Sequence, residues 1–445
     1  MSATPVDLLV TGGAVLTADD ADTYLPDGAV AIRAGRITAI GAASDLARQY
    51  TPAHTIDATD CLVLPGLVNA HSHLAMNLFR GRADDVDLQT FLERLVAAES
   101  AVLTADVVAS AVRLAAAESI RAGVTSAMDM YWFPEAGLAA ADAAGFRLVT
   151  GPTFMDVPGP PDGLDFAERL RRAPRFLRDG GARCVTPHST YTLDPDQLLE
   201  VAALAREHGA LLHIHAAENP AEVETVHARH GRRPVELLHH LGLLGPETLL
   251  AHAVDLTDHE IDLIAASGAG VAHCPVSNLK LASGIARVPE LLAAGVPVGL
   301  GSDGAVSANA LELFTPMRTA AVLHRVGAGA DATAVGARAA VRMATVEGAR
   351  AVGIGGLTGS LELGKAADLI VLDLNRPHLT PRHDPWSMLA YAAGPGDVRD
   401  TVIDGRVVMR DRRLLTIDEG AAVKELDALA AALPNPSDRP KRYPS

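Results

Sequence analysis

Residues 62–73 have the sequence LVLPGLVNAHSH, an apolar run that ends in two histidines separated by one serine. The apolar run predicts a buried strand over residues 62–69. Side chains two residues apart project from the same face of a strand, so His71 and His73 can bind one metal ion. An HxH motif is common in a chain with 17 histidines. Whether His71 and His73 bind a metal ion therefore depends on which polar residues lie at the ends of the other strands.

The central part of the chain, residues 62–355, alternates short apolar strands with helical stretches, a pattern typical of repeated βα units and a parallel sheet. About eight such units predict an α/β fold of the (β/α)8 TIM-barrel type, in which polar residues at the carboxyl ends of strands are expected to be catalytic. Besides residues 62–69, the predicted strands are residues 125–130, 146–150, 183–187, 211–215, 248–252, 270–273 and 296–301.

Both ends of the chain contain short alternating strands with glycine turns, which favour an antiparallel sheet. These strands are expected at residues 7–17, 28–42, 54–64, 367–374 and 398–410. We therefore predict a composite β-sandwich domain built from residues 1–61 and 356–445, beside a barrel domain over residues 62–355. The proline-rich tail from Pro434 is expected to be irregular.

The composition limits the classes of partner. The chain has 445 residues, a formal charge of −16 and no block rich in lysine or arginine, so we expect a small-molecule substrate rather than nucleic acid. No apolar run is long enough to predict a membrane span, and the N-terminus lacks the basic start and apolar core of a signal peptide. The three cysteines are too few for a disulfide framework. These features predict a cytoplasmic protein.

Three further strand ends supply metal-binding or acid–base groups. The strand LLHIH ends in His215 and is followed closely by Glu218, the strand TLLAH ends in His252, and the strand VPVGLGSD ends in Asp303. His213 lies deeper on the same strand as His215, where a role in the core or beside a ligand is expected. The strand ends therefore predict one site at the mouth of the barrel.

A divalent cation such as Zn²⁺, bound by imidazole nitrogens and one carboxylate, lowers the pKa of bound water to about 7 and supplies hydroxide at neutral pH. Glu218 has the right chemistry to transfer a proton to a leaving group. The residues thus point to hydrolysis.

The chain resembles the amidohydrolase superfamily over nearly its whole length. The motifs that resemble the family are PGLVNAHSH (65–73), PHSTYTL (187–193), HIHAAE (213–218), LLAHAVDL (249–256), HCPVSNLKLASGIA (273–286), GSDGAVSAN (301–309) and GSLELGKAADLIVLD (359–373). Within the superfamily it is similar to the branch of adenosine, methylthioadenosine and S-adenosylhomocysteine deaminases and triazine chlorohydrolases. The resemblance implies a metal-bearing barrel with a β-sandwich, and a homo-oligomer.

The resemblance also implies the roles of the site residues. It assigns the metal ligands to His71, His73, His215 and Asp303. Glu218 matches the proton shuttle, His252 the histidine that orients the attacking hydroxide, and Asp303 also assists its deprotonation. His188 matches a histidine that reaches the substrate ring. The strand ARCVTPH (182–188) has no lysine to bridge two metals, so one ion is expected: Zn²⁺, or alternatively Fe²⁺ or Mn²⁺.

The substrate is less well defined. Glu99 resembles a glutamate that binds ribose hydroxyls in nucleoside deaminases, although it could equally be a solvated helix residue, and Phe91 stands where some relatives have tryptophan. Relatives that accept S-adenosylhomocysteine are expected to have an arginine where this chain has Gly151. Ser307 is a further candidate for substrate binding. The loops at residues 84–99 and 155–165 contain no motif that identifies the substrate.

Other polar residues are given structural roles. His227, His230, His239 and His240 are expected on a solvated helix face, and Cys184 and Cys274 are expected in the core. His273, Asn278 and Asn309 are expected to shape the pocket or to brace the loop.

The function expected from these features is hydrolytic deamination of an aminopurine nucleoside or nucleobase of the adenosine or methylthioadenosine type. One alternative keeps the same machinery and releases chloride or an amine from a triazine, or cleaves a cyclic amide. A second alternative is a binding protein without catalysis, because a fold alone does not prove a function.

Overall fold

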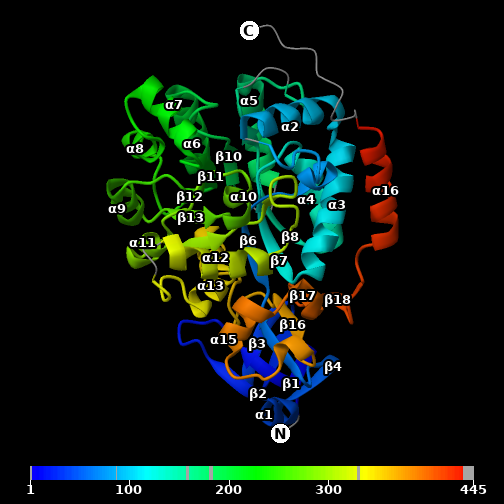
Figure 1. Cartoon of the computed structure of the whole chain (residues 1–445). Coiled ribbons are helices and arrows are strands. Elements are labelled where there is room, and N and C mark those ends of the chain that lie inside the picture. Colours follow the sequence, from blue (N-terminus) through cyan, green and yellow to red (C-terminus); the bar gives the residue numbers. More distant parts are fainter. Residues whose placement is uncertain (1–2, 87, 157–159, 180–183, 328–330, 434–445) are drawn as a thin grey trace.

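The computed structural model of the chain describes residues 3–86, 88–156, 160–179, 184–327 and 331–433. Two bodies are visible in Figure 1. The first and last strands, coloured blue and orange, form a β-domain at one end, and the remaining elements form a barrel surrounded by helices. The predicted irregular tail from Pro434 lies outside the described residues.

Parallel strands form the barrel. One sheet has the order β14-β13-β12-β11-β10-β9 and the other the order β15-β6-β7-β8. Only two residues separate β8 from β9, and two separate β14 from β15, so the chain itself joins the sheets at both ends. The strands are β6 (Leu67–His73), β7 (Val124–Asp129), β8 (Arg147–Thr150), β9 (Thr153–Phe154), β10 (Cys184–Pro187), β11 (Leu211–Ala216), β12 (Thr248–His252), β13 (Gly270–His273), β14 (Val298–Leu300) and β15 (Asp303–Gly304).

Helices between these strands begin and end at capping residues. The side chain of Asp194 accepts a hydrogen bond from the backbone of Gln197 at the start of α6, and Gly209 ends that helix in the left-handed conformation, as expected for such caps. The larger helices of the barrel are α2 (Leu88–Val102), α3 (Ala105–Arg121), α4 (Pro134–Ala144), α5 (Phe166–Asp179), α6 (Pro195–His208), α7 (Pro220–His230), α8 (Pro234–His240), α9 (Asp258–Ser267), α12 (Phe314–Gly327) and α13 (Ala337–Met343). The shorter ones are α10 (Pro275–Lys280), α11 (Val288–Ala293) and α14 (Val346–Ala351).

The β-domain contains strands from both ends of the chain, as predicted. The long strand β1 pairs antiparallel with β2 and parallel with β4 and β5, and β5 pairs antiparallel with β16. Its elements are β1 (Thr4–Leu16), β2 (Tyr24–Arg33), β3 (Arg36–Ala42), α1 (Ala43–Gln49), β4 (Tyr50–Asp57), β5 (Cys61–Pro65), β16 (Leu369–Asp373), β17 (Val398–Ile403), β18 (Arg406–Arg410) and β19 (Arg413–Leu414).

The predicted single strand over residues 62–69 is wrong, because the chain forms two strands there. β5 belongs to the β-domain sheet and β6 to the barrel, and Gly66 lies between them. A Cβ atom at Gly66 would lie 2.1 Å from Thr125 Oγ1. The crossing from one domain to the other thus requires a residue without a side chain.

The last helix, α16 (Glu419–Ala431), leaves the β-domain and packs along α3 of the barrel (Figure 1). Glu425 pairs with Arg113 at 2.6 Å, and Glu419 pairs with Arg121 at 3.1 Å. Among the described residues no single helix is long and apolar enough to cross a membrane. One pair of helices, bent by 118° to each other, is long and apolar enough when the two are taken together: Thr90–Val102 and Ala105–Arg121.

A buried ion pair joins the two domains. Arg147 on β8 donates two hydrogen bonds of 3.0 Å to Asp368, whose side chain is fully buried, and it also pairs with Asp404 at 2.6 Å. Arg147→Met leaves the Asp368 carboxylate buried without its cation, so we expect the free energy of unfolding to fall by about 3 kcal/mol in denaturant titrations.

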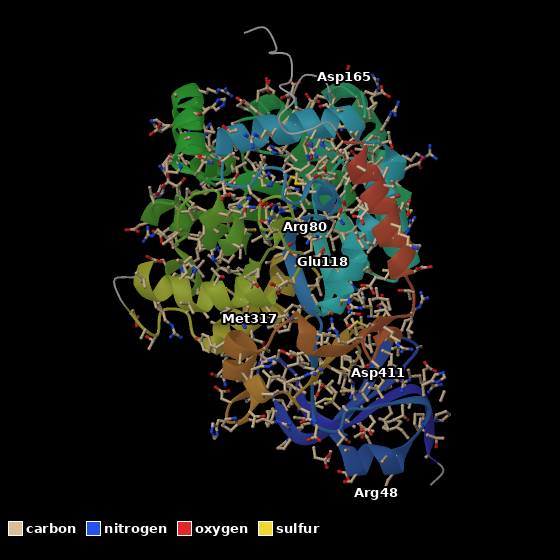
Figure 2. The ribbon with its side chains drawn as sticks, turned by 45° about the vertical axis from the view of Figure 1, so that its right-hand side comes forward. Arg48, Arg80, Glu118, Asp165, Met317 and Asp411 are labelled. Atoms are coloured by element: carbon tan, nitrogen blue, oxygen red, sulfur yellow. The ribbon has the colours of Figure 1, made fainter. Side chains whose placement is uncertain are left out.

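The matched control is Arg48→Met. Arg48 pairs with Asp45 at the exposed end of the β-domain (Figure 2), and the loss of such a surface pair is expected to cost less than about 1 kcal/mol. Equal effects of the two substitutions would show that the Arg147 pair does not stabilise the junction.

Candidate active site

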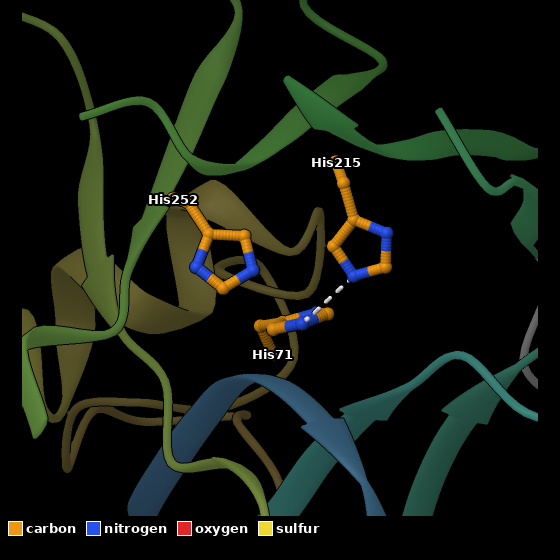
Figure 3. A group of neighbouring side chains, drawn as sticks. All are labelled: His71, His215 and His252. Atoms are coloured by element: carbon orange, nitrogen blue, oxygen red, sulfur yellow. Dashed lines mark hydrogen bonds between the residues drawn. The ribbon is translucent and has the colours of Figure 1, made fainter. Parts of the chain in front are cut away.

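Four strand ends bring together five side chains that could hold a metal ion at the carboxyl-terminal mouth of the barrel. They come from β6, β11, β12 and β15, and each of them is buried. Figure 3 shows the rings of His215 and His252 above the ring of His71. The five residues are His71, His73, His215, His252 and Asp303.

The distances between donor atoms match those around one metal ion. The Nε2 atoms of His71 and His215 are 3.3 Å apart, and Asp303 Oδ1 lies 3.4 Å from His71 Nε2 and 3.3 Å from His73 Nε2. Two ligands at 2.0–2.1 Å from a tetrahedral zinc ion are about 3.4 Å apart. His71, His73 and Asp303 form one group whose ligand atoms lie close enough together to share an ion, and His71, His215 and His252 form a second, so His71 belongs to both.

Neighbouring groups orient these histidines. Nδ1 of His73 is bonded to the carbonyl oxygen of Met130 at 2.5 Å, and Nδ1 of His215 to the carbonyl oxygen of His188 at 2.9 Å. Because a carbonyl can only accept, both Nδ1 atoms carry the proton, and the Nε2 lone pairs face the shared centre. His71 Nδ1 contacts His213 Nε2 at 3.0 Å. His213 thus lies beside a candidate ligand, as predicted.

The two carboxylate oxygens of Asp303 have different partners. Its Oδ1 faces His71 and His73, whereas its Oδ2 accepts hydrogen bonds from Ser277 at 2.5 Å and Ser307 at 2.8 Å. Burial raises the pKa of this carboxyl, but the hydrogen bond to His71 and the charge of His73 outweigh burial, so the pKa is lowered. The hydroxyl of Ser307 is therefore bound to Asp303, and its predicted contact with substrate stays a prediction.

Glu218 and His252 line the same cavity, and their charges influence each other. Burial raises the pKa of Glu218. Burial lowers the pKa of His252, but the charges of Glu218 and Asp303 outweigh it and raise that pKa. A carboxyl with a raised pKa keeps its proton more readily, which suits a general acid.

The backbone around this pair is constrained. The carboxylate of Glu222 accepts hydrogen bonds from the backbone amides of Ala217 and Glu218 at 3.0 and 2.7 Å. Ala217, His252 and Asp303 have φ angles of 53°, 72° and 60°. Left-handed conformations of non-glycine residues cost energy and cluster at functional sites. Here they terminate β11 and β12 and position β15, where the side chains must turn into the site.

Asn278 on α10 contacts His252. Its Oδ1 atom lies 2.9 Å from His252 Nδ1. This contact agrees with the expectation that Asn278 shapes the pocket or braces the loop, because an amide oxygen that accepts the Nδ1 proton leaves His252 Nε2 directed toward the site. Ser277 and Asn278 are consecutive, so one short helix orients both Asp303 and His252.

A cavity opens from the metal-binding residues toward α2. Glu99 lines it and is buried, so the alternative that Glu99 is a solvated helix residue is wrong. Its carboxylate accepts hydrogen bonds from Tyr131 Oη at 2.6 Å and Trp132 Nε1 at 3.4 Å. Burial raises the pKa of Glu99 to about 7. The polar part of the lining consists of His73, Glu99, Tyr131, Trp132, Thr153, His188, Tyr191, Thr192, His215, Glu218, His252, Asp303 and Ser307.

His188 lies in this cavity beside His215, with ring centroids 4.8 Å apart. Its Nδ1 is within hydrogen-bond distance of Ser189 and Thr192. Phe91, on α2, also lines the cavity. Gly151 has no room for a side chain, because a Cβ atom there would lie 1.7 Å from the carbonyl oxygen of Cys184.

Sequence reasoning did not find Tyr131, Trp132, Ser277 or Glu222. Tyr131 and Trp132 follow directly after β7, so the rule that strand ends form the site of a barrel would have indicated them. Ser277 lies in the motif HCPVSNLKLASGIA, and Glu222 lies four residues after Glu218. Which partners these residues contact depends on the folded arrangement.

The structure locates several residues that were expected to have structural roles. His227, His239 and His240 are exposed on α7 and α8, and in the described ranges no other group of three histidines, cysteines or acidic residues lies close enough to bind a metal ion. Cys184 and Cys274 are buried, and burial raises the pKa of both thiols.

The chain belongs to the amidohydrolase family, whose model matches residues 62–408. Residues 28–53 match an imidazolonepropionase-like composite domain of bacteria. A 5-methylthioadenosine/S-adenosylhomocysteine deaminase of Syntrophobacter fumaroxidans is 46% identical over 97% of this chain and 100% of its own length.

Two solved structures extend the comparison. An adenosine deaminase of Xanthomonas campestris with bound zinc is 36% identical, with a TM-score of 0.93 over 97% of this chain and 99% of that one. The zinc complex of an atrazine chlorohydrolase of Arthrobacter aurescens is 26% identical, with a TM-score of 0.88 over 95% of this chain and 100% of that one. The family model and the deaminase relatives establish a hydrolase that acts on carbon–nitrogen bonds. The solved structures establish the barrel and β-sandwich fold.

Proposed function

We propose that this chain is a metal-dependent hydrolytic deaminase of adenosine-type nucleosides. The observation that best supports this proposal is that a buried carboxylate, Glu99, shares one cavity with the histidine cluster and Glu218. A carboxylate can accept hydrogen bonds from two hydroxyls at once, which suits the ribose of a nucleoside. The names of the similar proteins support the same substrate class.

The metal-binding residues in this proposal are His71, His73, His215 and Asp303, and Zn²⁺ suits three nitrogens and one carboxylate. When bound, such an ion supplies hydroxide at neutral pH by lowering the pKa of water. The relatives crystallised with zinc support this choice.

The chain's own residues handle the protons. Glu218, with its raised pKa, protonates the purine ring nitrogen next to the amine-bearing carbon while water oxygen adds to that carbon. His252, oriented by Asn278, directs the attacking oxygen, and Asp303 receives its proton. Glu218, now a carboxylate, takes the proton from the hydroxyl of the tetrahedral adduct and transfers it to the amine, which leaves as ammonia as the carbonyl of the product forms. The proton on Asp303 then returns to Glu218. His188 contacts the ring from the side of β10.

The ribose role of Glu99 predicts a pH-dependent KM. Glu99 has a pKa of about 7, raised by burial, and only the ionised form accepts two hydroxyl hydrogen bonds. We expect KM for adenosine to fall severalfold between pH 6 and 8, because the carboxylate form accumulates as the pH rises through 7. Steady-state kinetics of ammonia release measures this dependence.

In Glu99→Gln the pH dependence of KM should disappear, and KM should be raised about 10- to 100-fold, which corresponds to the loss of hydrogen bonds to a charged group. Free adenine lacks the ribose and serves as the control substrate. An unchanged KM for adenosine in this variant would show that Glu99 does not bind the ribose.

A second candidate is release of chloride or an amine from a triazine, which the similarity to the atrazine chlorohydrolase favours. Chloride release from a chlorotriazine, without ammonia release from nucleosides, would support that reaction. A homo-oligomer remains a proposal that rests on the resemblance, and a cytoplasmic location remains one that rests on the features of the sequence.

A further inference from the structure

Lys280, the last residue of α10, joins three segments of the chain at the mouth of the barrel. Its ammonium group donates hydrogen bonds to the carboxylate of Asp84 at 2.5 Å, to the carbonyl oxygen of Val306 at 3.1 Å and to the side-chain oxygen of Asn309. Asp84 lies between β6 and α2, and the other two residues follow β15. An ammonium group has three N–H donors, so these acceptors use all of them.

Lys280 is not among the described residues that line the active-site cavity, although its neighbour Leu281 is. Since all three of its donors already have acceptors, it has none left for an anionic group of a substrate. Any contribution of Lys280 to the reaction must therefore pass through the residues that it holds in place.

Both hydroxyl groups that bind Asp303 lie close in sequence to the contacts of Lys280. Ser277, which donates to Asp303 Oδ2 at 2.5 Å, precedes Lys280 by three residues on the same helix. Ser307, which donates to the same oxygen at 2.8 Å, directly follows Val306. The contact between Lys280 and Val306 thus ties the helix that carries one donor to the loop that carries the other.

Arg80 holds the same loop on the other side of Ser307. It donates a hydrogen bond to the carbonyl oxygen of Asn309 at 2.8 Å and pairs with Glu118 on α3 (Figure 2). Asn309 has a φ angle of 63°, a left-handed conformation that asparagine tolerates. The loop is therefore fixed just before Ser307 by Lys280 and just after it by Arg80.

We propose that Lys280 is a positioning residue for the carboxylate of Asp303. By holding α10 against the loop after β15, it keeps the hydroxyls of Ser277 and Ser307 on Oδ2, so that Oδ1 stays directed toward the histidines of β6. This proposal rests on the proposed function, in which Asp303 binds the metal ion and receives the proton of the attacking oxygen. Groups that orient a metal ligand contribute about 10- to 100-fold to metal affinity or activity.

The test replaces Lys280 by methionine, which is also unbranched but has no charge. Zinc should pass from the full-length variant to a chromophoric chelator at least about 10-fold faster than from the unmodified chain. At saturating zinc, kcat for ammonia release from adenosine should fall about 10- to 100-fold, because a small displacement of a reacting group has a large effect on rate. KM should change less than about threefold, since the cavity lining around Glu99 keeps its contacts.

The variant is expected to fold. The side chains of Lys280 and Asp84 are 22% and 37% exposed, and an ion pair of this kind contributes little to stability, so the unfolding midpoint should fall by less than about 4 °C. Asp84→Asn is a milder variant that leaves Lys280 beside Val306, and it should accelerate zinc transfer in the same direction but less. No acceleration in either variant would overturn the proposal.

Lys365→Met is the matched control. Lys365 is a partly buried lysine far from the cavity that pairs with Glu362 at 2.9 Å and donates to Ser360 at 2.7 Å. Its replacement should leave zinc transfer and kcat unchanged. Equal losses in Lys280→Met and Lys365→Met would overturn the proposal, because they would show that the loss of any such lysine disturbs the site.

Ser307→Ala tests the path from Lys280 to Asp303. On its own it should also accelerate zinc transfer, and the double variant should lose zinc at nearly the rate of the faster single variant, because both changes release the same hydroxyl. Accelerations that multiply would show that Lys280 does not act through Ser307 and would overturn the proposal. Zinc transfer needs no substrate, so these measurements test Lys280 separately from the deaminase function, which only the absence of ammonia would contradict.

Discussion

Replacing Glu218 by glutamine is expected to lower kcat for nucleoside deamination by about 1,000-fold, within the range for loss of a general acid–base group. Glutamine has nearly the same shape and keeps the backbone contacts to Glu222, but it cannot donate and receive the proton that the ring nitrogen and the amine require. Bound metal and KM should stay close to those of the unmodified chain, because Glu218 is not among the proposed ligands.

The matched control is Glu224→Gln on the exposed face of α7, which should retain full activity. A Glu218→Gln protein that turns over at a normal rate would disprove the role assigned to this residue, whatever its metal content.

The second large effect is expected from His71→Ala. His71 belongs to both groups of side chains that could bind an ion, and its Nε2 atom lies within 3.4 Å of donor atoms on His215 and Asp303. We expect the unmodified chain to hold about one divalent ion after dialysis, as a site with three nitrogens and one carboxylate should. The variant should lose most of that ion, measured by elemental analysis, and should lose its activity with it.

His227→Ala and His239→Ala are the controls, because these exposed histidines on α7 and α8 lie outside the site. Both should keep the full metal content. A His71→Ala protein with unchanged metal content and activity would contradict the proposed metal site.

The sequence predicted the barrel and the β-domain well, because hydrophobic alternation and strand ends are local signals. It also placed all the predicted ligands at strand ends that converge in the structure. It failed at residues 62–69, where the run LVLPGLVN passes from one sheet to the other at Pro65 and Gly66. A Pro-Gly pair is a local turn signal, but the close approach of Gly66 to Thr125 on a distant strand is seen only in the folded chain.

The burial of Glu99 also could not be predicted from the local sequence. A glutamate in a helix is usually solvated, and from the sequence a solvated residue and a ribose ligand were equally good interpretations. Its burial depends on Tyr131 and Trp132, which reach it from the end of β7. Partners from different elements thus decide whether a charged residue belongs to the surface or to the site.

The central claim is that this site hydrolyses the amine of an adenosine-type nucleoside with the help of a bound metal. The most direct measurement is product analysis by mass spectrometry and ammonia release after zinc-loaded protein is incubated with methylthioadenosine, with its metal content measured in parallel. We predict one ammonia per nucleoside consumed and a product in which oxygen replaces the amine. Intact methylthioadenosine and no ammonia, in protein shown to hold zinc, would contradict this claim.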